Sequence, residues 1–389
     1  MDATLQAQLN QRREAHLYRT RLNVESGCSS LLQVDGRGLI NFCSNDYLGL
    51  AGHADIRRAL QQAADQYGTG SGASHLISGH SVAHHQLEEQ LAEFTGRPRA
   101  LLFSTGYMAN IGAINALIGR RDLIVQDQLN HASLLDGGRL SQADFQRYKH
   151  NDIAHLRQRL ETSSAPRKLI VTDGVFSMDG DTAPLREISN LAAEHNAWLM
   201  VDDAHGLGVL GQQGAGLVEQ LSLDIEQVPV LMGTLGKSFG TFGAFIAGSE
   251  ALIETLIQFS RSYIYTTALP PAIAAATLAS LKIVRREDWR RDKLTQLIQR
   301  FRSGAEQIGL QLAASSTPIQ PLLINDDQKV MQLGQQLRAA GFLVGAIRPP
   351  TVPAGTGRLR ITLSAEHSDE QIDQLLDALD RLSGSDKPV

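Results

Sequence analysis

Short apolar runs that alternate with helical patterns constrain the fold of this 389-residue chain more than any other feature of its sequence. Each run has the length of a buried strand, and helix candidates lie at 84–95, before the first run, and at 185–195, between two later runs. This alternation predicts right-handed crossovers and an α/β fold, with a mainly parallel sheet flanked by helices on both faces. The predicted strands are 100–103, 123–126, 145–148, 169–172, 199–201 and 228–232.

The pattern changes in the last third of the chain. A strand at 242–247 follows a tight turn at 236–240, and we expect it to run antiparallel beside its predecessor. Beyond about residue 270 a long, highly charged helical tract begins, and the C-terminal residues then read as strand, helix, strand, strand, helix. We therefore expect three parts: an N-terminal helical segment at 1–47, a large ligand-binding domain at 48–284 and a small C-terminal α/β domain at 285–389.

Composition excludes several classes of protein. Hydrophobic residues at 42% and charged residues at 20% are typical of an ordinary globular protein, and the net charge of -5 argues against nucleic acid as a partner. The sequence lacks an apolar stretch long enough to span a membrane, so we expect no membrane association. Cys28 and Cys43 are too few for a disulfide framework, which is consistent with a cytoplasmic location.

The residues that end the predicted strands carry the chemistry, because ligands of open α/β sheets bind beyond the carboxyl ends of the strands. VDDAHGLG (201–208) places Asp202 at a strand end and His205 three positions later. GTLGKSFG (233–240) places Lys237 among small and hydroxylated neighbours, 35 positions after Asp202. Pyridoxal 5'-phosphate needs a lysine for its aldehyde, an acid for its ring nitrogen and donors for its phosphate. The order and spacing therefore predict a pyridoxal phosphate site.

Two segments resemble nucleotide-binding motifs but do not match them. The GKS at 236–238 resembles the end of a P-loop, but that motif needs a glycine where the chain has Leu231. GTGSGASHLISG (68–79) is rich in glycine, yet it follows a helical pattern and lacks the spacing of a dinucleotide fingerprint. We interpret it as a flexible loop at the border of the ligand site.

A metal hydrolase is the other enzyme class considered. Asp202, Asp203, His205 and His131 are possible ligands, but they have no closed ligand spacing, and a metal centre would leave Lys237 without a role. We therefore expect no metal.

From about residue 10 to residue 380 the chain resembles the α-oxoamine synthases, a family of fold type I pyridoxal phosphate-dependent enzymes. The most specific segments are NFCSNDYLGL (41–50), GSGASHLISGHSVAHHQLE (70–88), NHASLLDG (130–137), GVFSMDGD (174–181), VDDAHGLGVLG (201–211), GTLGKSFG (233–240) and IRPPTVPAGTGRLRIT (347–362).

The resemblance implies a role for each cofactor contact. Lys237 binds the cofactor covalently and later removes the α proton of the amino acid, Asp202 pairs with the ring nitrogen, and His131 stacks on the ring. The other implied contacts are Ser177 and His205 with the phenolic oxygen, Gly106, Tyr107 and Thr234 with the phosphate, and Thr266 or Thr267 with the phosphate of the partner chain in a homodimer.

On the substrate side, Arg360 in RLRIT matches the arginine that binds the amino-acid carboxylate, and Asn45 is expected nearby. Arg19 and Thr351 match positions that contact substrate in some members of the family, and His131 also faces the substrate. ISGHSVAHHQLE and IRPPTVPAGT favour the members that condense L-alanine with a pimeloyl thioester of coenzyme A or acyl carrier protein in biotin synthesis.

Two alternatives stay open. Asp173 stands where these synthases are expected to have glutamate, and TDGVFSMDG matches glycine C-acetyltransferase instead. A cofactor-binding regulator is the alternative from another class, but it would be expected to lose Lys237 or to add a DNA-binding module, for which the first forty residues look too short.

Overall fold

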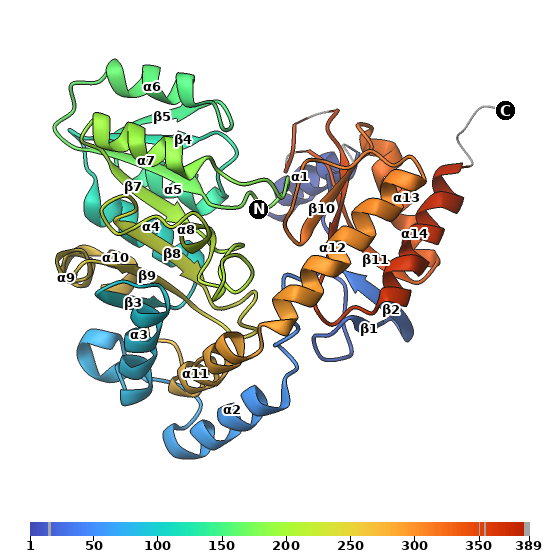
Figure 1. Cartoon of the computed structure of the whole chain (residues 1–389), viewed down its shortest axis with the longest axis horizontal. Helices are drawn as coiled ribbons and strands as arrows, with labels where there is room; N and C mark the ends of the chain where they lie inside the picture. The colour runs from blue at the N-terminus through green and yellow to red at the C-terminus, as the bar shows by residue number, and fades with distance from the viewer. Residues whose placement is uncertain (15–16, 350, 354, 385–389) are drawn as a thin grey trace.

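The computed structural model describes residues 1–14, 17–349, 351–353 and 355–384. Figure 1 shows two lobes, each built around one sheet. The helices α11 (Pro271–Arg286) and α12 (Trp289–Gln307) run from the larger lobe to the smaller one. The arrangement is the α/β fold that the strand and helix pattern predicts.

The large sheet has seven strands in the order β3-β9-β8-β7-β6-β4-β5. Its parallel strands come from the predicted runs, and β9 pairs antiparallel with both β8 and β3, which confirms the expected return strand. The bounds are β3 (Arg99–Phe103), β4 (Leu123–Asp127), β5 (Asp144–Tyr148), β6 (Lys168–Asp173), β7 (Trp198–Asp202), β8 (Val230–Thr234) and β9 (Ala244–Gly248).

Helices cover both faces of this sheet, which explains why its inner strands are continuously apolar rather than alternating; the edge strand β5 is largely polar. In β6, Leu169 and Val171 belong to one buried cluster, while Ile170 belongs to the cluster on the opposite face. The first face packs against α4 (Gly106–Leu117), α5 (Ala132–Leu140) and α9 (Glu250–Phe259), and the second against α6 (Ile153–Glu161), α7 (Leu185–Glu194) and α8 (Leu217–Gln220).

The small lobe contains a five-stranded sheet in the order β1-β2-β11-β12-β10. The C-terminal elements follow the expected order of strand, helix, strand, strand, helix: β10 (Ile319–Leu323), α13 (Asp327–Ala339), β11 (Phe342–Ile347), β12 (Arg358–Thr362) and α14 (Asp369–Gly384).

Residues 31–42 differ from the sequence expectation, because they form β1 (Leu31–Val34) and β2 (Arg37–Phe42) rather than part of a helical segment. These strands pair as a hairpin, and β2 extends the C-terminal sheet by pairing parallel with β11. Asp35 and Gly36 join them with φ angles of 51° and 69°. An Asp-Gly pair with two positive φ angles is a strong hairpin signal, so the turn was readable in the sequence.

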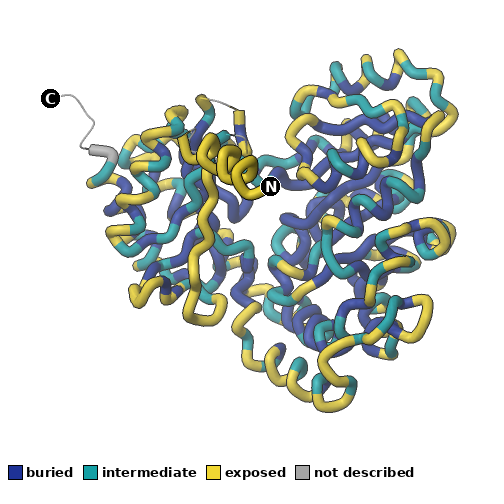
Figure 2. The backbone as a smooth tube through the Cα atoms, turned by 180° about the vertical axis from the view of Figure 1, so that it is seen from behind, coloured by how far each residue is buried: buried dark blue, intermediate teal, exposed yellow. Residues whose placement is uncertain are grey.

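The sequence predicts an amphipathic helix over residues 1–21. The first element, α1 (Asp2–Glu14), is helical as expected, but residues 17–21 are not helical, and α1 buries none of its residues in this chain. Figure 2 shows it as an exposed helix on the surface. The predicted helix also covers residues 15–16, which lie outside the described residues. No described helix has both the length and the hydropathy that crossing a membrane requires.

The glycine-rich segment interpreted as a loop lies between α2 (Ala54–Tyr67) and α3 (Val82–Phe94). Its second half is not a loop but a short π-helical turn, His75–Gly79. The short helix α10 (Arg261–Ile264) follows α9 and packs nearby, with the Tyr263 ring stacked on the His75 ring at a centroid distance of 5.1 Å.

Candidate active site

A cavity of about 200 Å³ lies at the carboxyl ends of β6, β7 and β8, facing the N-terminus of α4. Most of the residues expected to contact the cofactor line this one cavity, although they come from distant parts of the sequence. The lining residues are Gly106, Tyr107, Asn110, His131, Ser133, Asp173, Ser177, Asp202, Ala204, His205, Met232, Thr234 and Lys237.

Lys237 stands in the turn between β8 and β9. Gly240 closes that turn with a φ of 63°, and a Cβ at this position would collide with the backbone of Ala51. The Lys237 Nζ atom lies 2.7 Å from Nε2 of His205. Burial lowers the pKa of Lys237 to about 8, while the carboxylates of Asp202 and Asp173 act in the opposite direction. A much larger share of this amine is therefore neutral near pH 7 than for an ordinary lysine.

Asp202 is the last residue of β7 and is buried. The Asn110 side chain donates a hydrogen bond to Asp202 Oδ2 at 2.7 Å, and the Ala204 N–H donates to Oδ1 at 3.0 Å. Both donors hold the carboxyl group in a fixed orientation. Asp173 ends the neighbouring strand, and its pKa is raised well above the ordinary value by burial and by the charge of Asp202.

The N-terminus of α4 closes another side of the cavity. The Thr105 hydroxyl caps the helix by accepting a hydrogen bond from the Met108 N–H at 3.2 Å. At Gly106 a Cβ would lie 2.7 Å from the Met232 methyl carbon, so only glycine fits without a shift of that methionine. The free N–H groups and the dipole of a helix N-terminus favour an anion such as a phosphate. The Tyr107 hydroxyl donates to Asp136.

His131 is held by its neighbours at the start of α5. Its backbone N–H donates to Asp173 at 2.7 Å, and its Nδ1 lies 2.7 Å from the Ser133 hydroxyl. The Asn110 amide donates to that hydroxyl at 2.9 Å. Burial lowers the pKa of His131, although the charge of Asp202 opposes the shift. The imidazole is therefore neutral at pH 7, and His131 lines the cavity.

Arg360 lies in β12 of the small lobe but reaches the large lobe. Its Nε donates to the Ser177 carbonyl at 2.6 Å, and its Nη2 donates to Asn45 Oδ1 at 3.1 Å. The expected neighbourhood of Asn45 and Arg360 is thus present in the structure. The contact with Ser177, a residue of the cavity, places the guanidinium at the border of the site.

The remaining predicted residues lie elsewhere in this chain. Arg19 and Thr351 line a separate pocket between the segment 17–20 and the end of β11. Thr267 forms an isolated bridge with Ser74, and its carbonyl accepts a hydrogen bond from Ser104 at 3.3 Å. Neither Thr266 nor Thr267 lines the cavity of the single chain. Their contact with a partner's phosphate stays a prediction.

Sequence reasoning assigned no role to several residues that the structure places at the site. Asn110 lies in STGYMAN (104–110), directly after a predicted strand, Ser133 lies in NHASLLDG (130–137), and Asp173 is predicted only as a departure from the family pattern. Tyr47 is fully buried, and its hydroxyl lies 2.6 Å from Nδ1 of His205. Its position in NFCSNDYLGL was the only signal, because nothing in the local sequence connects it with a residue 158 positions away.

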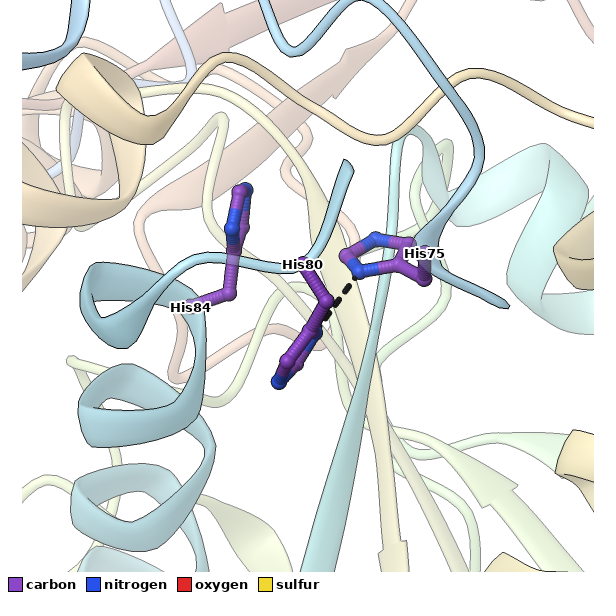
Figure 3. A group of neighbouring side chains, drawn as sticks. All are labelled: His75, His80 and His84. Atoms are coloured by element: carbon purple, nitrogen blue, oxygen red, sulfur yellow. Dashed lines mark hydrogen bonds between the residues drawn. The ribbon is translucent and has the colours of Figure 1, made fainter. Parts of the chain in front are cut away.

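A second group of histidines, His75, His80 and His84, lies near the start of α3 (Figure 3). Their ring nitrogens are close enough to hold a metal ion, but the protein already uses them. His84 Nδ1 accepts the Ser81 N–H at 3.0 Å, and its Nε2 donates to the Leu269 carbonyl at 2.7 Å. His75 and His80 are hydrogen-bonded to each other at 2.9 Å. The histidine cluster therefore has a structural role: His84 caps α3, and His75 and His80 pack beside it.

The metal hydrolase alternative has no support from the geometry at the strand ends. Among the residues that the structure describes, Asp202, Asp203, His205 and His131 do not form a group with ligand geometry. Asp203 is turned away from the cavity, where its Oδ2 accepts the Leu217 N–H at 2.6 Å. Burial raises the pKa of Asp203 to about 8, so a carboxyl that a metal would need ionised is largely protonated at pH 7.

The donor set of the cavity fits pyridoxal 5'-phosphate. It combines an amine of lowered pKa, a buried carboxylate that accepts two hydrogen bonds, and a helix N-terminus whose first residue is a glycine. The fold and this cavity define a fold type I pyridoxal phosphate-dependent enzyme, and residues 37–379 match the family model for aminotransferase class I and II.

The chain belongs to the 8-amino-7-oxononanoate synthase family. It is 59% identical over 381 residues to an 8-amino-7-oxononanoate synthase of Saccharophagus degradans, covering 97% of this chain and 96% of the relative. Among solved structures it is similar to a Sphingomonas wittichii serine palmitoyltransferase, with 34% identity, a TM-score of 0.93 and 97% of each chain covered. A structure of SPT with a PLP internal aldimine gives 30% identity and a TM-score of 0.92, with 98% of this chain and 97% of that chain covered.

Proposed function

We propose that this chain condenses L-alanine with a pimeloyl thioester, of coenzyme A or acyl carrier protein, to give 8-amino-7-oxononanoate, carbon dioxide and free thiol in biotin synthesis. A bond forms between the alanine α carbon and the acyl carbonyl carbon, while the carbon–sulfur bond and the bond to the alanine carboxylate break. The observation that carries this proposal is the lysine, aspartate and helix N-terminus around one cavity in a chain 59% identical to a named synthase.

The cavity residues would hold pyridoxal 5'-phosphate in a fixed orientation. Lys237 would bind it covalently, Asp202 would pair with its ring nitrogen, and His131 would stack on its ring. When bound, the cofactor supplies an electron sink for the pair left on the α carbon. The remaining contacts that we assign are Ser177 and His205 with the phenolic oxygen, and Gly106, Tyr107 and Thr234 with the phosphate.

Lys237 is the proposed base that removes the α proton of alanine. A base must be unprotonated when it acts, and the lowered pKa of about 8 supplies a useful neutral fraction near pH 7. The Asp202 carboxylate also acts on Lys237: it raises the pKa of the amine and so favours its charged form. After carbon dioxide leaves, the same amine would return the proton to the α carbon.

Arg360 is the proposed site for the alanine carboxylate, since a guanidinium binds a carboxylate with two parallel hydrogen bonds. Asn45 Oδ1 accepts a hydrogen bond from Nη2 of that guanidinium at 3.1 Å. We assign Arg19, Thr351 and His131 to the acyl substrate or the amino acid. A homodimer in which the partner supplies Thr266 or Thr267, and a cytoplasmic location, complete the proposal.

A thiol-release assay tests the proposed function. Alanine, glycine and serine are each combined with pimeloyl, acetyl, succinyl and palmitoyl thioesters, and the free thiol is measured. We expect the highest kcat/KM with alanine and a pimeloyl thioester. A preference for glycine with acetyl coenzyme A, which the Asp173 motif would favour, would overturn the proposed substrates but keep the class of enzyme.

A further inference from the structure

A continuous chain of hydrogen bonds connects Arg360 to Lys237. Arg360 Nη2 lies 3.1 Å from Asn45 Oδ1, and the Tyr47 hydroxyl lies 3.1 Å from the same oxygen. That hydroxyl also lies 2.6 Å from Nδ1 of His205, whose Nε2 lies 2.7 Å from Lys237 Nζ. This series of hydrogen bonds crosses from the small lobe to the large lobe, and Tyr47 is the third of its five residues.

Elementary hydrogen-bond chemistry fixes the direction of each link. The Arg360 guanidinium has only donors, so the Asn45 atom that faces it must be the oxygen. That oxygen can only accept, so the single proton of the Tyr47 hydroxyl is directed toward Asn45. The Tyr47 oxygen is then left to accept a hydrogen bond from Nδ1–H of His205. In a neutral imidazole this leaves Nε2 as an acceptor, and it faces the Lys237 amine.

Burial keeps the two central groups neutral, as this assignment requires. His205 is buried, and burial with the nearby charges of Lys237 and Arg360 lowers its pKa well below the ordinary value. Tyr47 is fully buried, and burial raises its pKa to about 12. His205 therefore exists as one of two neutral tautomers.

We propose that Tyr47 is a positioning residue that holds His205 in the Nδ1–H tautomer and thereby presents Nε2 as a hydrogen-bond acceptor to Lys237. The charge state of the lysine then depends on a tyrosine that does not touch it. This inference adds to the proposed function, but it concerns the protein itself and requires no turnover. The other charged or titratable groups that act on Lys237 or lie beside it are Asp173, Asp202, His131 and Arg360.

The test compares Tyr47→Phe with the wild type, both as full-length chains freed of cofactor. Nitrogen-15 NMR of histidine-labelled protein reports the His205 tautomer, and amine labelling of Lys237 across pH, followed by peptide mapping, reports its titration midpoint. We expect the variant to change to the Nε2–H tautomer, because Nδ1–H would have no acceptor. Its N–H then opposes the ammonium, so the lysine midpoint falls by about one pKa unit, a tenfold change in the ionisation constant.

Tyr148→Phe is the matched control, because Tyr148 is equally buried in β5 and lies outside the hydrogen-bond chain. Asn45→Ala reaches the same link by another route, since it removes the acceptor of the Tyr47 proton and frees that proton for Nδ1 of His205. Both test variants should shift the tautomer, and the control should not.

Each outcome bears on the inference separately from the proposed reaction. If Tyr47→Phe does not fold, Asn45→Ala alone decides the result. An unchanged His205 tautomer in the folded variants overturns the inference, whatever the thiol-release assay shows. A shifted tautomer with no thiol release would support Tyr47 as the positioning residue and contradict the proposed function instead.

Discussion

His205 and His150 follow strands of the same sheet, and both use their two ring nitrogens in hydrogen bonds, yet their surroundings favour opposite charges. His205 faces Lys237 and Tyr47, and its pKa lies well below the ordinary value. His150 follows β5 and lies between Asp127, at 3.1 Å, and Asp181, at 2.7 Å. Burial alone would lower the pKa of His150, but the two aspartates raise it to about 10.

The difference shows that charged partners can reverse the effect of burial, which by itself lowers the pKa of both histidines. Two carboxylates stabilise the imidazolium of His150, whereas burial and the nearby charges of Lys237 and Arg360 favour the neutral ring of His205. One edge of the sheet thus contains an ion-paired histidine and a neutral histidine. Of the two, His205 lines the cavity that we propose binds the cofactor.

Lys237→Ala should have the largest effect of the substitutions considered. We expect turnover to fall by at least about 1000-fold, because the variant loses both the covalent link and the base. The pKa of His205 should also rise, since the charge of Lys237 contributes to lowering it. The thiol-release assay and histidine NMR measure the two effects. Lys282→Ala, at an exposed position of α11, is the control, and near-normal turnover in Lys237→Ala would contradict the assigned base.

Asp202→Asn should keep the cofactor but lower turnover by about 100-fold, which corresponds to about two pKa units of lost support for a protonated ring nitrogen. Visible absorbance measures cofactor binding, and thiol release measures turnover. Asp203→Asn is the matched control: it is adjacent, buried and already largely protonated at pH 7 because its pKa is about 8. Equal losses in the two variants would argue against a special role for Asp202.

His150→Gln should leave turnover nearly intact and reduce the free energy of unfolding by about 2–3 kcal/mol. A histidine whose pKa is raised on folding contributes stability that is fully present below pH 6.5 and is lost as the pH rises through about 10. Urea unfolding of the wild type and the variant at several pH values measures this. The difference between them should shrink between these limits, and a constant difference would exclude the ion pairs as its source.

His84→Ala tests a third kind of buried histidine, one that bonds to backbone groups. We expect the free energy of unfolding to fall by about 1–2 kcal/mol through loss of the Ser81 and Leu269 contacts, with no change in turnover. His85→Ala, exposed on the next position of α3, should change stability by less than about 0.5 kcal/mol. Similar losses in the two variants would show that the cap of α3 adds little stability.

Elements with a strong local pattern were predictable from the sequence. The continuous apolar runs of the large sheet, the antiparallel β9 and the order of elements in the C-terminal lobe depend on short-range signals, and the structure contains them. The hairpin at 31–42 has a local signal in its Asp-Gly turn, but its place in the C-terminal sheet has none. The β2 strand pairs with β11, about 300 positions later, and no local pattern reports a contact between residues so far apart.

The sequence by itself determined that Asp202, His205 and Lys237 would meet, because each follows a strand of one parallel sheet and all such strand ends lie at one edge. Only the tertiary structure decided how these groups are linked to the rest of the protein. Arg360, Asn45 and Tyr47 come from opposite ends of the chain, and the small lobe must pack on the large one before their hydrogen bonds exist. The position at which a strand ends is a local property of the sequence, whereas the proton state of a buried amine depends on every charge that folding brings near it.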